Sequence, residues 1–117
     1  MTRLLEPTSQ IWYAETQGRI VASIAVDGVD LGDGRAHLRW FIVDDGLRGM
    51  GMGKMLIQKA MAFCDENAFA ETHLWTLQGL EPARRLYESN GFVLVDEYRG
   101  DQWGTEIVEQ KFVRLLH

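Results

Sequence analysis

A glycine-rich turn between an apolar strand and a helical segment restricts the fold of this chain more than any other feature. The turn spans residues 44–53 and has glycine at positions 46, 49, 51 and 53, too many for a strand or a helix interior. Phe41-Ile42-Val43 ends the apolar run before it, and apolar residues recur with helical spacing from about Lys54. The sequence therefore predicts a strand, a tight turn and a helix N-terminus in direct succession.

Runs rich in β-branched and aromatic residues on both sides of this turn predict further strands. We expect strands at residues 11–14, 20–26, 36–43, 72–77, 92–95 and 105–116, and helices from about residue 54 and from about residue 81 to 90. The first two strands are typical of an antiparallel hairpin. Consecutive apolar residues at the end of the third indicate a strand buried on both faces, and glycines between residues 100 and 104 separate the last two strands. This order predicts one mixed α/β domain over residues 1–117.

Charge and composition exclude several classes of protein. The 117 residues carry a formal net charge of −5, which argues against a general nucleic-acid or anionic-membrane binder. No apolar run is long enough to span a bilayer or to form a signal peptide, so we expect a soluble, cytoplasmic protein. The one cysteine, Cys64, lies on an apolar helical stripe and indicates a core residue, and no group of residues has metal-ligand spacing.

The turn has the features of an anion site. The first N–H groups of a helix have no intrahelical partner, and Arg48 and Lys54 add two cations beside them. It is not a P-loop, because Gly53-Lys54 is followed by Met55, which has no hydroxyl group, and the dinucleotide-binding glycine spacing is also absent. The pattern that fits is Arg-x-x-Gly-x-Gly, from Arg48 to Gly53.

That pattern resembles the acetyl-CoA signature of the GNAT superfamily of N-acyltransferases. Residues 83–92, Ala-Arg-Arg-Leu-Tyr-Glu-Ser-Asn-Gly-Phe, resemble a second segment of the same superfamily, at the matching separation of one helix and one strand. The resemblance covers residues 11–116. It implies a GNAT-type α/β fold with a mixed, mostly antiparallel sheet flanked by helices. The equivalent of the second family strand begins at about Ile11, so the N-terminal strand and helices of the family are missing or shortened.

Other short segments suggest a subgroup of this superfamily. The chain is most similar to acetyltransferase domains that are fused to MarR-type regulators, in residues 40–43, 74–76, 103–104 and 109–112. The four tryptophans, Trp12, Trp40, Trp75 and Trp103, are interpreted as core or interface residues, with Trp103 a further candidate for lining an acceptor pocket.

The resemblance implies acetyl-CoA as the acyl donor. Its pyrophosphate would lie on the backbone of the glycine turn and its pantetheine arm beside the preceding strand. The implied cofactor-binding residues are Phe41, Ile42, Val43, Arg48, Gly49, Met50, Gly51, Met52, Gly53 and Lys54. No metal is implied.

The implied reaction is acetyl transfer to a primary amine of a small molecule or a protein. Tyr87 is the implied general acid, and a backbone N–H at the end of strand 36–43 is the implied oxyanion donor. His37 is a candidate general base because histidine titrates in the useful range, or else a surface or capping residue.

A second hypothesis is a non-catalytic acyl-CoA-binding or regulatory module. The donor residues fit both hypotheses, Tyr87 favours the enzyme, and the short N-terminus favours a module without an acceptor pocket. The chain would then be a fragment of a larger protein or would be completed by a partner, and an uncovered apolar face would favour a homodimer.

Overall fold

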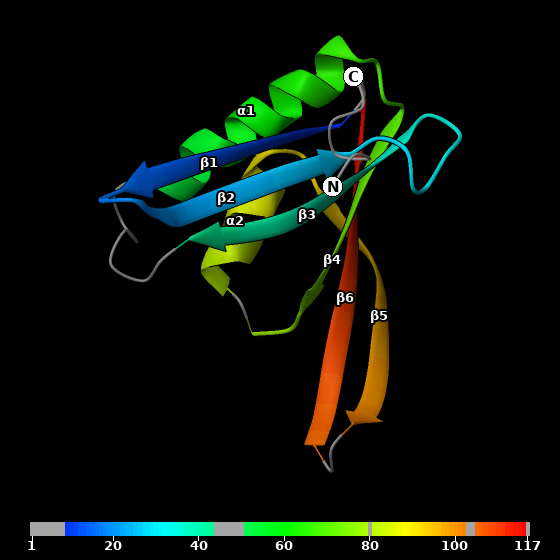
Figure 1. Ribbon diagram of the computed structural model, residues 1–117. Coiled ribbons are helices and arrows are strands. Elements are labelled where there is room, and N and C mark those ends of the chain that lie inside the picture. Colours follow the sequence, from blue (N-terminus) through cyan, green and yellow to red (C-terminus); the bar gives the residue numbers. More distant parts are fainter. Residues whose placement is uncertain (1–8, 44–50, 80, 103–104, 117) are drawn as a thin grey trace.

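The computed structural model describes residues 9–43, 51–79, 81–102 and 105–116 (Figure 1). Arg48, Gly49 and Met50 of the predicted cofactor site, and Trp103, lie outside these ranges. The elements are β1 (Gln10–Thr16), β2 (Arg19–Asp27), β3 (Arg35–Val43), α1 (Met52–Glu66), β4 (Glu71–Leu77), α2 (Glu81–Ser89), β5 (Val93–Gln102) and β6 (Thr105–Leu115). Their order is the one predicted. None of the helices in the described part of the chain is long and apolar enough to cross a membrane.

The six strands form one sheet in the order β1-β2-β3-β4-β6-β5. β3 and β4 pair in parallel, and every other neighbouring pair is antiparallel. The predicted hairpin of the first two strands is confirmed. Its turn is made by Gln17 and Gly18, both with positive φ (53° and 76°), the backbone conformation that a two-residue hairpin turn requires.

Both helices contribute to one core on the same side of the sheet. The core cluster contains residues of β2, β3, β4 and β6 together with five residues of α1, namely Leu56, Ile57, Ala60, Met61 and Cys64. At the edge of this core the rings of Trp12 and Phe63 meet edge to face, 5.4 Å apart. Cys64 is fully buried as predicted, and its burial raises the pKa of the thiol to about 11.

β3 and β4 separate shortly after they pair. Arg35–His37 of β3 pair with Glu71–His73 of β4, and from there β3 continues beside β2 while β4 continues beside β6. A bulge in the β2–β3 pair marks the point of divergence, where Trp40 has a φ of 53° and its carbonyl accepts a 2.8 Å hydrogen bond from the Ser23 hydroxyl. Figure 1 shows the two strands running apart beyond this point.

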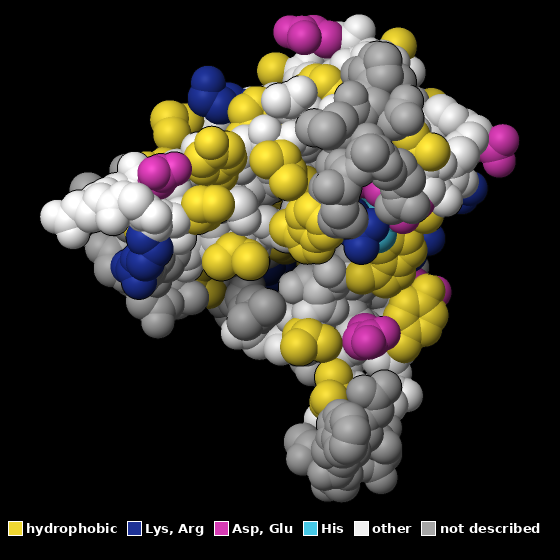
Figure 2. Space-filling model, viewed as in Figure 1, with side chains coloured by type: hydrophobic (Ala, Val, Ile, Leu, Met, Phe, Trp, Pro, Cys, Tyr) yellow, Lys and Arg dark blue, Asp and Glu magenta, His cyan; other side chains and the backbone are white. Residues whose placement is uncertain are grey.

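Two details of the sequence prediction are wrong. The end of β3 is not buried on both faces: Trp40 is 39% exposed and Ile42 is 63% exposed, because both helices lie on the other side of the sheet. Figure 2 shows hydrophobic side chains over the uncovered face. The strand predicted at residues 92–95 is also too short, although the last two strands are separated where predicted. β5 continues to Gln102, with Gly100 opposite Ile107, because pairing with β6 satisfies the backbone.

Candidate active site

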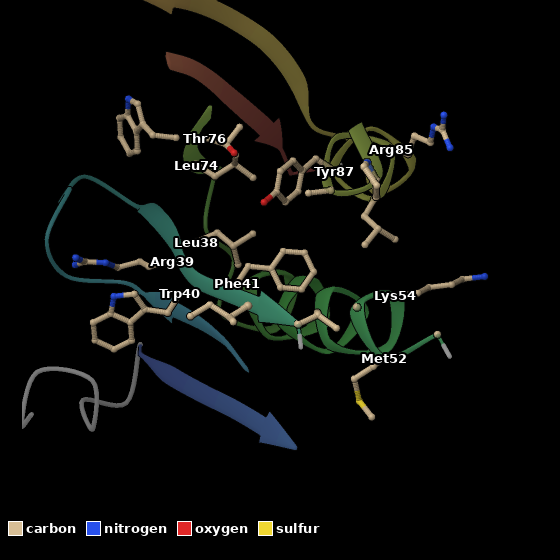
Figure 3. A pocket seen from close by; sticks show the side chains of 18 of the residues that line it. Leu38, Arg39, Trp40, Phe41, Met52, Lys54, Leu74, Thr76, Arg85 and Tyr87 are labelled. Atoms are coloured by element: carbon tan, nitrogen blue, oxygen red, sulfur yellow. The ribbon is translucent and has the colours of Figure 1, made fainter. Parts of the chain in front are cut away.

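A cavity of about 850 Å³ occupies the space where β3 and β4 diverge (Figure 3). α1 and α2 close it on the core side of the sheet. It is lined by residues 38–43 of β3, 51–54 at the start of α1, 74–76 of β4, Gly79, and 82, 83 and 85–87 of α2. The separation of two parallel strands is thus the structural origin of the cavity.

One end of the cavity, called here the donor end, is made by residues 51–54 and Arg85. Gly51 adopts the left-handed conformation (φ 75°) before α1, and the first helical hydrogen bond runs from the Met55 N–H to the Gly51 carbonyl at 3.0 Å. The N–H groups of residues 52–54 therefore have no partner within the helix, and Gly51 gives them no side-chain cap. Lys54 and Arg85 also line this end, so a backbone anion site lies beside two cations.

Gly53 allows close packing at the donor end. A Cβ added at this position would lie 3.1 Å from Cδ1 of Leu86, 3.4 Å from Cζ of Phe41 and 3.6 Å from Cγ2 of Val43. Any side chain at Gly53 would therefore crowd the three elements that meet here. This contact brings the start of α1 close to β3 and to α2.

Tyr87 lies in the middle of the cavity wall. It is only 7% exposed, and its ring lies about 6 Å from the rings of Phe41, Phe92 and Phe112. Figure 3 shows the phenol directed into the cavity from α2. Burial raises the pKa of Tyr87 to about 12, so the hydroxyl keeps its proton at neutral pH. The side chain can therefore donate a proton or a hydrogen bond to a group in the cavity.

His37 is not among the described residues that line the cavity. Its Nδ1 lies 2.9 Å from Oδ2 of Asp30, and its ring meets the ring of Trp75 edge to face at 4.9 Å. The histidine therefore supports the cavity wall through Trp75. Its role as a general base stays a prediction.

The other predicted residues that the structure describes come together at the cavity. Phe41, Ile42 and Val43 line it from β3, and Gly51, Met52, Gly53 and Lys54 line it from the start of α1.

The sequence interpretation missed the residues at the opposite end of the cavity, called here the far end. Arg39, Trp40 and Trp75 line this end, and Figure 3 shows Arg39 and Trp40 on the side away from Lys54 and Arg85. The available signal was a cation, Arg39, next to the apolar run that ends this strand. The tryptophans were interpreted as core or interface residues, but Trp40 and Trp75 are cavity residues.

Comparison with known proteins gives the family. The sequence profile of the acetyltransferase (GNAT) family matches residues 2–92 of the chain. The chain belongs to the GNAT acetyltransferase family. Over 87 residues it is 34% identical to N-acetylaspartate synthetase of Xenopus tropicalis, a match that covers 74% of this chain and 32% of that protein. The chain thus spans about a third of the length of this relative.

Solved structures confirm the GNAT fold. A GNAT-family acetyltransferase of Staphylococcus aureus is 26% identical and superposes with a TM-score of 0.79, covering 99% of this chain and 73% of that one. A proposed streptothricin acetyltransferase of Bacillus anthracis, solved in complex with acetyl coenzyme A, is 21% identical with a TM-score of 0.77 over 99% of this chain and 67% of that one. These comparisons do not bear on the resemblance to MarR-fused domains, which stays a prediction.

Proposed function

We propose that this chain binds acetyl-CoA in the cavity between β3 and β4 and transfers the acetyl group to an amine. The observation that carries the proposal is the arrangement of one cavity with an uncapped helix start at one end and a buried, protonated tyrosine in its wall. Membership of the GNAT family and the acetyl coenzyme A complex of a structural neighbour support the choice of donor.

The residues present fit acetyl-CoA. The N–H groups of residues 52–54 would hold the pyrophosphate, since Gly51 and Gly53 bring no side chain between the backbone and an anion. Lys54 and Arg85 would neutralise phosphate charge at the cavity mouth. Beyond His37, the edge of β3 that faces away from β2 pairs with no other strand in the described part of the chain, so it could pair with the amide groups of the pantetheine arm, as a further strand would.

Bound acetyl-CoA supplies the acetyl group and a thiolate leaving group. The acceptor nitrogen forms a bond to the acetyl carbon and loses one proton, while the bond from that carbon to sulfur breaks and the sulfur gains one proton. Tyr87 holds the proton that the sulfur needs, and the proton released by the amine restores the phenol. The apolar wall formed with Phe41 and Leu86 excludes water from this exchange.

Release of free CoA from acetyl-CoA in the presence of amines tests the proposed function. We expect CoA release that depends on an added amine, with the N-acetyl product identified by mass spectrometry. A chain that binds acetyl-CoA but releases no CoA with any amine would instead be the non-catalytic binding module. A chain without measurable binding at millimolar acetyl-CoA would contradict both.

A further inference from the structure

The far end of the cavity holds a cation that donor binding does not use. Arg39 lines the cavity on the side away from Lys54 and Arg85 (Figure 3), so its guanidinium lies far from the place proposed for the phosphates. Its side chain is 31% exposed, and this leaves room for a ligand. The acceptor must approach from this side if the donor enters beside α1.

Two carboxylates hold Arg39 in place from one side. Its Nη1 lies 3.6 Å from Oδ2 of Asp27 and 3.8 Å from Oδ2 of Asp30. Asp27 is fully buried, and its Oδ1 accepts hydrogen bonds from the N–H groups of Val29 and Asp30 at 3.0 and 3.2 Å. Because the turn itself fixes the Asp27 carboxylate, the two ion pairs hold Nη1 on the side of this turn.

Only Nη1 takes part in these ion pairs. Within the described part of the chain, neither Nε nor Nη2 of Arg39 donates a hydrogen bond. A guanidinium has five donors in a planar fork that matches a carboxylate in two-point contact. The donors that remain are therefore available to a ligand in the cavity.

The Trp40 ring flanks the guanidinium, whose central carbon lies 5.3 Å from the centre of that ring. Trp75 also lines the cavity, and its ring meets the ring of His37, two residues before Arg39. Figure 2 shows basic and histidine side chains next to hydrophobic side chains on this face of the sheet. The surroundings suit a small ligand with one anionic group and an apolar portion.

We propose that Arg39 binds a carboxylate of the acceptor, so that the substrate is an amine that also carries a carboxylate, such as an amino acid. This inference rests on the proposed acetyl transfer. A carboxylate fits better than a phosphate because Asp27 and Asp30 place two negative charges beside the one guanidinium, and their repulsion of a ligand grows with the negative charge that the ligand carries. The amine would then extend from Arg39 along the cavity toward Tyr87.

Paired acceptors test this assignment. Initial rates of acetylation are measured with free α-amino acids and β-alanine, and with the carboxamide of each, which keeps the amine and removes the negative charge. We expect kcat/KM for the acids to exceed that for the amides by about tenfold or more, the effect of a charge-assisted pair of hydrogen bonds. Peptides with an acidic second residue test whether the carboxylate belongs to a protein N-terminus and not to a free amino acid. A preference for the free acid over its amide, or for the acidic peptide over the matching amide peptide, supports the proposal.

Arg39→Lys assigns the preference to this side chain. The lysine keeps a positive charge next to buried Asp27 but lacks the planar fork, so we expect the ratio of acid to amide kcat/KM to fall about tenfold, mainly through KM of the acids. Arg99→Lys is the matched control. Arg99 pairs with Glu106 at 2.7 Å on the surface of the β5–β6 pair, and the ratio should not change.

The two proposals fail in different ways. Acetylation of acids and amides at equal rates, or an unchanged ratio in Arg39→Lys, would overturn carboxylate recognition and leave acetyl transfer intact. CoA release with other amines, but with none of these acids or amides, would also overturn carboxylate recognition. If no amine of any kind gives CoA release, acetyl transfer itself fails. Circular dichroism and acetyl-CoA binding establish that each variant is folded. If Arg39→Lys does not fold, Arg39→Gln provides a second replacement, one without a charge.

Discussion

The two ends of the cavity are built from different parts of the polypeptide. The donor end is mainly backbone: the left-handed Gly51, the uncapped N–H groups of α1, and Gly53 packed against β3 and α2. The far end is made of side chains, with Arg39 held by Asp27 and flanked by Trp40. A ligand at the donor end meets groups that every residue type carries, whereas a ligand at the far end meets groups specific to this sequence.

Under the proposed function, this difference would separate the binding of a common donor from the selection of an acceptor. Substitutions of the glycines at the donor end should act through added volume, and substitutions at the far end should act through lost charge or shape. Tyr87 lies between the two ends and should affect the chemical step itself. The effect of a substitution should therefore depend on the end of the cavity in which it lies.

Removal of the Tyr87 hydroxyl should have the largest effect. We expect Tyr87→Phe to lower kcat by about 100-fold or more with little change in acetyl-CoA affinity, because general acid catalysis contributes on this scale. Steady-state kinetics and a binding titration measure the two separately. Because the pKa of Tyr87 is raised to about 12, ionisation of the phenol should not limit the rate below about pH 11.

Tyr98→Phe is the control for this substitution. Tyr98 lies exposed on β5, and Asp96, which accepts its hydrogen bond, raises its pKa. Loss of its hydroxyl should leave kcat unchanged. Equal loss in both variants would mean that Tyr87 has no special role.

A side chain at Gly53 should weaken donor binding. We expect Gly53→Val to lower acetyl-CoA affinity by about 10- to 100-fold, since the added carbons meet Leu86, Phe41 and Val43 at contact distance or closer. Gly100→Ala is the control, because a Cβ there has no atom within 4 Å. Calorimetry measures both affinities, and full affinity in Gly53→Val would contradict the backbone site.

The packing of α1 on the sheet should show in the pH dependence of stability. The pKa of Cys64 is about 11 in the folded chain, against an ordinary value of 9.0 for a cysteine thiol, so the unfolded chain loses its proton first. The free energy of unfolding should therefore fall by about 2 kcal/mol between pH 9 and pH 11. Cys64→Ala should reduce this slope, as measured by urea unfolding across that range, and should leave only the part that the raised pKa of Tyr87 contributes above about pH 10. An identical slope in the variant would show that the thiol is not shielded by the core.

The smallest expected effect concerns the charge at the donor mouth. Arg85→Gln should lower acetyl-CoA affinity by about threefold at low salt and less at high salt, because a partly exposed ion pair is screened. Titrations at two salt concentrations measure the change. A salt-independent loss would mean that Arg85 acts through packing and not through charge.

The sequence predicted the element order and the glycines at the start of α1 because both depend on local patterns. Strand alternation, helical spacing and the glycine turn each lie within a few residues, so Gly51 and Gly53 could be placed at a helix start from the sequence alone. The family motif added Tyr87. Both predictions depend on neighbours in the chain.

The far end could not be predicted in this way. It exists because β3 pairs with β4 only over residues 35–37 and 71–73, and nothing local to either strand sets that limit. Arg39 and Trp75 come from different strands, and they line the same cavity only once the sheet has formed. The exposure of Ile42 was missed for the same reason, since it depends on which face the helices cover.

One titration tests the division of the cavity most directly. Acetyl-CoA is titrated by calorimetry into the unmodified chain, Gly53→Val and Arg39→Lys. We expect one binding site that Gly53→Val weakens by about tenfold or more and that Arg39→Lys leaves within about threefold. Equal loss in the two variants, or no binding to the unmodified chain, would contradict this division.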